Sequence, residues 1–259
     1  MKPYLLVDFG STYTKLTAVD LEGEYIIGTA KAPTTVETNV LDGYDKAFKY
    51  LINDHPEIKE ISGISACSSA AGGLKMAAIG LVEELTVEAA KRACLGAGAI
   101  VKKVYTHHMT KQEARELKEA DIDIVLLAGG TNGGNKECIL HNAQKLKDIN
   151  IGVPVIIAGN KDAIDEIEEL FEGTDIEYYI VKNVMPQLKK LEVKEAKFAI
   201  RKIFIEKIIE AKGIKKAEEK IGEIIMPTPE AVLQAAELLS NGYEDEEGYG
   251  ELIVVDIGG

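Results

Sequence analysis

The residues best suited to chemistry form one short turn near the N-terminus, residues 8–15, with the sequence Asp-Phe-Gly-Ser-Thr-Tyr-Thr-Lys. Its glycine lets the backbone pass close to a phosphate group, and the hydroxyls and nearby N–H groups can donate to phosphate oxygens. The carboxylate of Asp8 can hold Mg²⁺, usually through water. We therefore predict a phosphate turn with Asp8 as catalytic and metal-binding residue. Its predicted phosphate-binding residues are Gly10, Ser11, Thr12, Thr14 and Lys15.

Two alternatives stay open for this turn. Gly-Ser-Thr is also a common way to build an ordinary β-hairpin, and a single match of this length is only moderately specific. Lys15 supplies a positive charge on the strand that follows, but a lysine there can equally be a solvated strand residue.

A second aspartate and glycine motif closes the chain. The apolar run 251–255 leads into Asp256-Ile257-Gly258-Gly259, which repeats the strand, aspartate and glycine order of the phosphate turn. Such a repeat is expected when two related half-domains hold one nucleotide from opposite sides. We predict Asp256 as a second catalytic and Mg²⁺ carboxylate, with Gly258 and Gly259 on phosphate. Because a domain rarely ends inside a glycine turn, we expect a truncated chain or a fragment.

The densest glycine cluster lies in the middle of the chain, between a predicted strand and a predicted helix. Anions bind readily at such a position, so one interpretation is a second phosphate or partner-contact loop. The other is a wide turn that merely needs positive φ angles. The residues of this glycine loop are Gly129, Gly130, Thr131, Asn132, Gly133, Gly134 and Asn135.

The elements around these motifs indicate an α/β fold in two parts. Strands at 4–9, 13–20 and 25–31, a helix at 41–53 and a strand at 61–67 suit half of a ribonuclease-H-like, actin/Hsp70-type domain. We assign residues 1–73 to the first part of this ATPase domain.

From residue 74 to 192 strands and helices alternate, the last helix being 184–191, which predicts an inserted, doubly wound α/β module with a parallel sheet. Residues 193–250 form a helical segment, with helices at 194–222 and 229–240. Residues 251–259 begin a second, truncated actin-like half with one more strand.

Composition limits the partners. The 259 residues include 43 acidic and 30 basic side chains, a net charge of −13, which repels nucleic acid. Three scattered cysteines at positions 67, 94 and 138 indicate reduced thiols. The N-terminal apolar run is interrupted by Asp8, so neither a signal peptide nor a membrane span fits. We expect a cytoplasmic protein without membrane or nucleic-acid partners.

Four separated segments carry a resemblance to a known family: LVDFGSTYTKLTAVD, SSAAGGLKMAAIGLV, VLLAGGTNGGN and LIVVDIGG. In this order they resemble the GlmL (MutL) family, accessory proteins encoded beside adenosylcobalamin-dependent glutamate mutase and related aminomutases. The resemblance covers nearly the whole chain. It is unrelated to the mismatch-repair proteins that share the name.

The resemblance implies an ATP-dependent reactivating chaperone with ATP and Mg²⁺ as cofactors and a mutase subunit as partner. ATP binding and hydrolysis would change the angle between domains and release damaged cobalamin. The threonines expected after Gly259 and the adenosine-binding segment are absent, so ATP hydrolysis is expected of the full-length protein and impaired in this chain. Whether the protein forms a homodimer stays open.

Other functions remain in competition. A small-molecule kinase of the same superfamily needs a carboxylate base, for which Asp162 is a weak candidate. The middle module can also be a non-catalytic nucleotide- or cobalamin-interacting domain, although a DxHxxG motif is absent. An iron–sulfur activator of dehydratases would need clustered cysteines.

Overall fold

The computed structural model describes residues 2–35, 40–69, 74–211, 221 and 224–255. The chain divides into two compact units, each described by itself below. Unit 1 combines residues 1–72 with residues 203–259, and unit 2 is the continuous segment between them, Gly73–Lys202.

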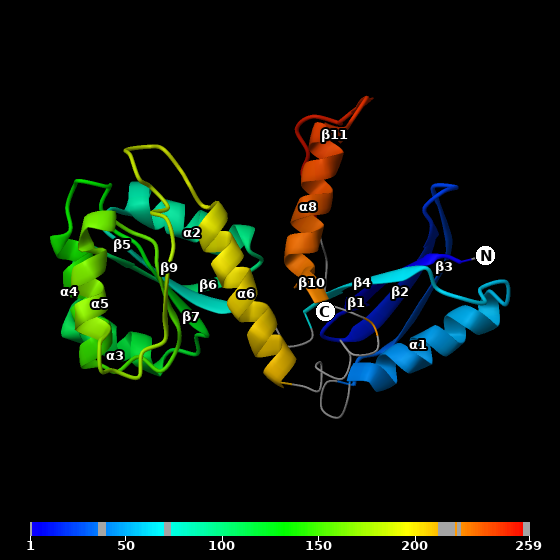
Figure 1. The fold of residues 1–259 in the computed structure, drawn as a ribbon, viewed down its shortest axis with the longest axis horizontal. Coiled ribbons are helices and arrows are strands. Elements are labelled where there is room, and N and C mark those ends of the chain that lie inside the picture. The colour runs from blue at the N-terminus through cyan, green and yellow to red at the C-terminus, as the bar shows by residue number, and fades with distance from the viewer. Residues whose placement is uncertain (1, 36–39, 70–73, 212–220, 222–223, 256–259) are drawn as a thin grey trace. The chain divides into compact units, whose positions relative to one another are not determined.

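Unit 1 is built on a five-stranded mixed sheet with the order β10-β4-β1-β2-β3 (Figure 1). β1, β2 and β3 form an antiparallel meander, whereas β4 and β10 run parallel to β1. The elements are β1 (Tyr4–Phe9), β2 (Tyr13–Asp20), β3 (Tyr25–Pro33), α1 (Val40–Asp54), β4 (Gly63–Ser68) and β10 (Ile224–Pro227).

Helix α1 covers one face of this sheet. Alternate residues of β1 are buried, Leu5, Val7 and Phe9, as the two-residue repeat of a strand requires. The ring of Phe9 lies 6.4 Å from that of Tyr44 on α1. The residues between the buried ones therefore point to the opposite face, and they include Asp8.

Strand β10 is absent from the sequence prediction, which places a helix up to residue 222 and a helix cap around Pro227. The run Ile224–Pro227 is short and ends in proline, so its pattern alone does not distinguish it from a linker. In the structure it pairs with β4, Met226 opposite Cys67 and Pro227 opposite Ser68. The chain then turns directly into α8 (Thr228–Asn241).

The predicted strand at the C-terminal end is wrong for the residues that the structure describes. Residues 251–255 have no strand conformation, and Ile253 is 94% exposed. An apolar run forms a strand only where a neighbouring strand supplies hydrogen bonds, and within the described chain none pairs with this segment. The hairpin before it consists of β11 (Gly242–Tyr243) and β12 (Glu246–Glu247).

Unit 2 is a parallel α/β sheet with the order β6-β5-β7-β8-β9. Its strands are β5 (Lys75–Gly80), β6 (Ile100–Thr106), β7 (Ile124–Leu127), β8 (Val155–Ile157) and β9 (Tyr178–Ile180). Its helices are η1 (Glu83–Val87), α2 (Glu88–Gly96), α3 (Lys111–Glu119), α4 (Glu137–Asp148), η2 (Lys161–Ala163), α5 (Ile164–Phe171) and the first part of α6 (Lys194–Ala211).

Helices cover both faces of this sheet (Figure 1). Leu117 of α3, Ile139 of α4 and Phe171 of α5 join one hydrophobic cluster with alternate strand residues such as Leu127. The strand residues between them, such as Leu126, are buried as well. Because both faces are covered, the central strands are continuously apolar, as parallel strands usually are.

The predicted helix 184–191 is wrong. Pro186 disfavours a helical conformation for the residue before it. Neighbouring segments also occupy the backbone: Val184 N donates to Ala158 O, and Pro186 O accepts from Asn132 N, both at 3.0 Å. The segment is a turn with an isolated bridge between Gln187 and Lys190.

Candidate phosphate-binding site

Three strand ends of unit 1 meet at one edge of its sheet. β1, β4 and β10 are parallel, so their carboxyl ends lie side by side, and ligand sites commonly form at such an edge. Asp8 lies near the end of β1, Cys67 is directly opposite it on β4, and Thr228 follows β10. Lys15 lies opposite Asp8 on the other neighbouring strand, β2.

The Asp8 carboxylate is hydrogen-bonded at one oxygen and faces a lysine at the other. Thr228 Oγ1 donates to Asp8 Oδ1 at 2.8 Å, and Cys67 Sγ lies 3.7 Å from the same oxygen. Lys15 Nζ lies 3.5 Å from Oδ2. The Oδ1 atom of Asp8 is thus fixed by a hydrogen bond, whereas Oδ2 has only a long ion pair with Lys15.

Lys15 is well placed to move to a ligand. Its side chain is 62% exposed, against 22% for Asp8. An exposed ion pair of this kind stabilises a protein by about 0–1 kcal/mol. Releasing Lys15 from Asp8 to a phosphate oxygen therefore costs little.

Gly10 begins a tight turn between β1 and β2. Its N–H donates to Tyr13 O at 3.1 Å, and a Cβ at this position would lie 2.6 Å from that oxygen. A side chain would therefore force the turn open. Ser11 and Thr12 follow at the tip and are exposed, so the tip of the turn faces solvent.

Thr14 lies apart from these residues. It is fully buried, its Oγ1 is 3.1 Å from that of Thr34, and it lies against Gly43 of α1. Strand alternation places it on the α1 side, opposite Asp8 and Lys15. The structure thus brings Asp8, Gly10 and Lys15 together with the exposed tip and leaves Thr14 on the other face.

Cys67 contributes a neutral group to this edge. Burial raises the pKa of its thiol to about 11, assisted by the negative charge of Asp8 and opposed by the hydrogen bond from Thr228. The thiol is therefore protonated at neutral pH. A cavity of about 330 Å³ lies next to Cys67. It is lined by Asp8 and Lys15 and by apolar side chains such as Leu6 and Ile225.

The residues at this edge fit a nucleotide with Mg²⁺. The donor set consists of a carboxylate and hydroxyl oxygens, which are hard ligands that Mg²⁺ prefers. Among the described residues, no group of three or more His, Cys, Asp or Glu side chains is placed to hold a metal ion.

Two residues that contact the Asp8 carboxylate, Cys67 and Thr228, are absent from the site predicted from the sequence. The sequence offers little signal for Thr228, because the run 224–227 before it is too short to distinguish a strand from a linker. The predicted residues Asp256, Gly258 and Gly259 lie outside the described residues.

The glycine loop of unit 2 follows β7 at the carboxyl edge of the second sheet. Gly130 has a φ of +69°, and a Cβ there would lie 1.9 Å from Asn135 O. Buried Asn183 donates to Gly130 O and to Asn132 Oδ1, both at 3.0 Å. Gly133 N donates to Asp162 Oδ2 at 2.7 Å. The loop is thus rigidly built, and a carboxylate of the protein already occupies one N–H that an anion would need.

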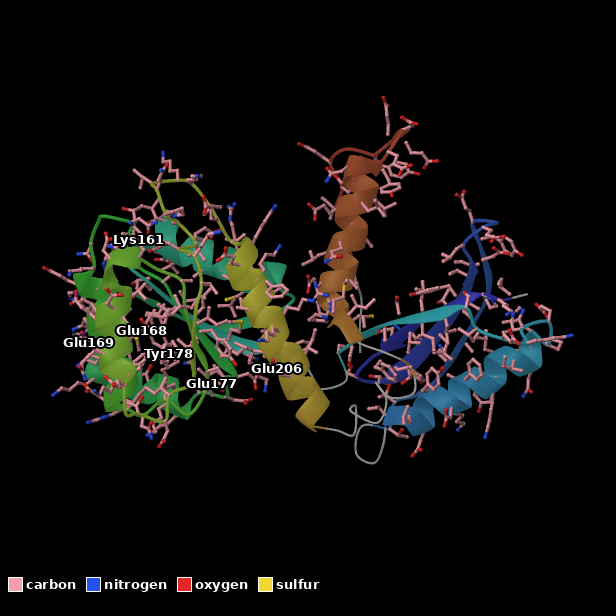
Figure 2. The ribbon with its side chains drawn as sticks, viewed as in Figure 1. Lys161, Glu168, Glu169, Glu177, Tyr178 and Glu206 are labelled. Carbon is pink, nitrogen blue, oxygen red and sulfur yellow. The ribbon has the colours of Figure 1, made fainter. Side chains whose placement is uncertain are left out.

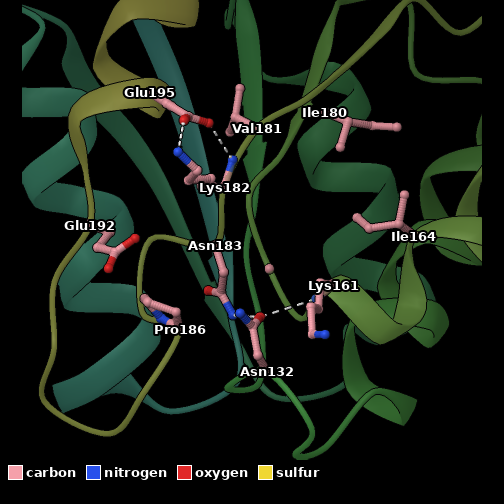
Figure 3. A pocket seen from close by; sticks show the side chains of 11 residues that line it. Asn132, Lys161, Ile164, Ile180, Val181, Lys182, Asn183, Pro186, Glu192 and Glu195 are labelled. Atoms are coloured by element: carbon pink, nitrogen blue, oxygen red, sulfur yellow. Dashed lines mark hydrogen bonds and ion pairs between the residues drawn. The ribbon is translucent and has the colours of Figure 1, made fainter.

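A cleft of about 460 Å³ adjoins this loop (Figure 3). Asn132 lines it and accepts from Lys161 N at 3.2 Å, and on the far side Glu195 accepts from Lys182 N at 3.0 Å. Lys182 and Glu195 also form an ion pair through their side chains. The other two charged side chains of the cleft also have ion-pair partners, Lys161 with Asp162 and Glu192 with Lys190.

Unit 2 is nearly neutral, since residues 73–202 include 20 acidic and 19 basic side chains. Its acidic residues include Glu168 and Glu169 of α5, which are exposed and are labelled in Figure 2. None of the helices in the described part of the chain is both long and apolar enough to cross a membrane.

Comparison with known proteins defines the class. A sequence model of the family described as MutL protein matches residues 4–259. The chain belongs to this family, which confirms the resemblance to the GlmL (MutL) family. The curated Protein MutL of Clostridium tetanomorphum is 55% identical over 261 residues. That match covers 100% of this chain and 56% of the relative, so the chain spans about half the relative's length.

Solved structures give only weak likenesses. The chain is similar to component A of the (R)-2-hydroxyglutaryl-CoA dehydratase of Acidaminococcus fermentans, with 11% identity, a TM-score of 0.22 and coverage of 70% of this chain and 92% of the other. The chain is also similar to the ADPNP-bound activator of the 2-hydroxyisocaproyl-CoA dehydratase of Clostridium difficile. That likeness has 12% identity, a TM-score of 0.20 and coverage of 86% of this chain and 99% of the other. TM-scores this low do not establish a shared fold.

Proposed function

We propose that the full-length protein is an ATPase of the actin-like type that binds ATP and Mg²⁺ at the phosphate turn. The observation that carries this proposal is the edge at which Asp8, Lys15 and the Gly10 turn come together. Asp8 would hold Mg²⁺ through its carboxylate, and Lys15, whose ion pair with Asp8 is weak, would neutralise a phosphate oxygen. The exposed tip donates hydrogen bonds to phosphate.

The fold of unit 1 supports this proposal. Its order β3-β2-β1-β4-β10, with three antiparallel strands followed by two parallel ones, is that expected of a ribonuclease-H-like half-domain. We infer that residues 251–259 begin the second half, with Asp256, Gly258 and Gly259 on the other side of the nucleotide. Unit 2 is then an insertion between β4 and β10.

We further propose that the protein reactivates an adenosylcobalamin-dependent aminomutase, such as glutamate mutase, by exchanging damaged cobalamin in the cytoplasm. Membership of the MutL protein family supports this role. In this proposal the glycine loop of unit 2 contacts the partner, because it is preformed and one of its N–H groups is already bound to Asp162. The same contact occupies Oδ2, one of the two oxygens of the Asp162 carboxylate.

Substitution of Asp8 in the full-length protein tests the nucleotide site. Asp8→Ala removes the carboxylate, and we expect Mg²⁺-dependent ATP hydrolysis to fall about a hundredfold or more. Circular dichroism should stay unchanged. Asp54→Ala is the matched control, because Asp54 is an exposed residue at the end of α1. Unchanged turnover in Asp8→Ala would remove this turn from the mechanism.

A second assay tests the partner. The full-length protein is incubated with inactivated glutamate mutase, fresh adenosylcobalamin and ATP, and phosphate release is followed alongside mutase activity. Recovery that depends on hydrolysis supports the reactivating role. Hydrolysis without recovery would indicate a different partner or a small-molecule kinase.

A further inference from the structure

We propose that Thr228 is the residue that positions the Asp8 carboxylate for the metal ion, an inference that rests on the proposed function of this edge. The two residues are 220 positions apart in the sequence, and the hydroxyl of Thr228 donates to Asp8 Oδ1 at 2.8 Å. Both belong to unit 1.

The threonine is rigidly placed. It is the first residue of α8 and follows β10 directly, and β10 is itself paired with β4 next to Cys67. A β-branched side chain has restricted freedom about χ1. The Oγ1 atom also lies 3.6 Å from Cys67 Sγ, which borders it on the β4 side. The hydroxyl therefore has a defined direction toward Asp8.

The hydrogen bond distinguishes the two carboxylate oxygens. Rotation of an aspartate about χ2 is broad and roughly twofold, so an unrestrained carboxylate offers either oxygen in many orientations. With Oδ1 held by Thr228, Oδ2 is the oxygen that faces Lys15, at 3.5 Å. A cation that displaces Lys15 then meets Oδ2 in a fixed orientation, and the preorganisation favours its binding.

This arrangement gives the segment after unit 2 a part in the site. Without β10, Asp8 would keep Lys15 but lose its hydroxyl donor. The metal-binding carboxylate is thus in its working orientation only when residues 224–228 are docked beside β4.

The test compares Thr228→Val with Thr228→Ser in the full-length protein. Valine keeps the branched shape and removes the hydroxyl, whereas serine keeps the hydroxyl. Thr29→Val is the matched control, because Thr29 is exposed on β3 and no polar contact of its side chain is found within the described chain. Binding of Mn²⁺ in the presence of ADP is measured from the paramagnetic resonance signal of free Mn²⁺, and thermal unfolding is measured in parallel.

We expect Thr228→Val to weaken Mn²⁺ binding about tenfold and Thr228→Ser to stay within about threefold of the wild type. Thr29→Val should match the wild type, and all melting temperatures should agree within a few degrees. Equal Mn²⁺ binding by Thr228→Val and the wild type would overturn this inference alone. Absence of Mn²⁺ binding by the wild type would instead count against the proposed nucleotide site.

A crystal structure of Thr228→Val provides a readout that needs no ligand. The Asp8 carboxylate is expected to leave its wild-type rotamer, because the donor to Oδ1 is gone. A carboxylate that keeps the same orientation without the hydroxyl would overturn the positioning role even if no nucleotide binds.

Discussion

At the scale of single residues, alanine substitutions at Gly130 and Gly173 distinguish the cost of backbone strain from the cost of a steric clash. Their φ angles are +69° and +70°, but a Cβ at Gly130 would meet Asn135 O at 1.9 Å, whereas nothing lies within 4 Å at Gly173. A left-handed alanine costs about 1–2 kcal/mol, partly offset by a less flexible unfolded chain. We expect Gly173→Ala to lower the free energy of unfolding by about 1 kcal/mol and Gly130→Ala by about 3 kcal/mol or more.

Urea denaturation of the two variants measures this difference. Both variants carry a similar cost of backbone strain. The additional loss in the free energy of unfolding of Gly130→Ala therefore measures the steric clash inside the glycine loop. Equal losses would mean that the loop relaxes without cost and is not rigid, which would weaken its proposed role as a preformed contact surface.

The residues of the candidate site could be predicted only in part. Residue types and spacing singled out Asp8, Gly10 and Lys15, which the fold does bring together. Spacing alone did not reveal that Thr14 faces α1, since that depends on which strand face the helix covers. It also could not pair Asp8 with Thr228, because the contact forms only after β10 joins the sheet.

At the scale of elements, long periodic segments were predictable and segments governed by tertiary contacts were not. The alternation of strands and helices predicted from residue 74 onward includes α4 (Glu137–Asp148), because its apolar repeat is strong. The expected helix 184–191 fails because the backbone bonds of Val184 and Pro186 go to neighbouring loops. β10 escaped because four residues next to a proline carry too little pattern.

Asn142 connects α4 to the segment before α3 and should be costly to replace. It is fully buried, its Oδ1 accepts from Met109 N, and its Nδ2 donates to His107 O, both at 2.8 Å. Asn142→Leu keeps a similar volume but leaves the buried N–H of Met109 without its acceptor, at about 1–3 kcal/mol, and removes the donor to the O atom of exposed His107. We expect the free energy of unfolding to fall by about 3 kcal/mol.

The control for this prediction lies on the same helix. Gln144 makes an exposed hydrogen bond to Asp148, so Gln144→Leu should change stability by less than about 0.5 kcal/mol. Both variants are compared by urea denaturation. A loss of less than about 1 kcal/mol in Asn142→Leu would show that water replaces the lost bonds and that α4 does not depend on this connection.

At the scale of the whole molecule, unit 1 depends on unit 2 more than unit 2 depends on unit 1, because only unit 1 is made of two separate segments of the chain. Unit 2 is continuous in sequence, and its hydrophobic cluster draws on strands β5, β7 and β8 and on helices α3, α4 and α5. Unit 1 needs residues from both sides of unit 2, because β4 pairs with β10. Because unit 2 is the segment that connects β4 to β10, these two strands can pair only when the two ends of unit 2 lie close together.

We accordingly expect residues 73–202 to fold without the rest of the chain. About 130 residues are enough for one core, and both faces of the sheet are covered by helices of the same segment. The isolated fragment should unfold in urea in a single cooperative transition with dispersed amide resonances. A shorter fragment, residues 73–150, lacks β8 and β9, so Leu127 loses its neighbours on one side and cooperative unfolding should disappear. If residues 73–202 also lack a cooperative transition, unit 2 draws its stability from unit 1, and its description as an autonomous insertion is wrong.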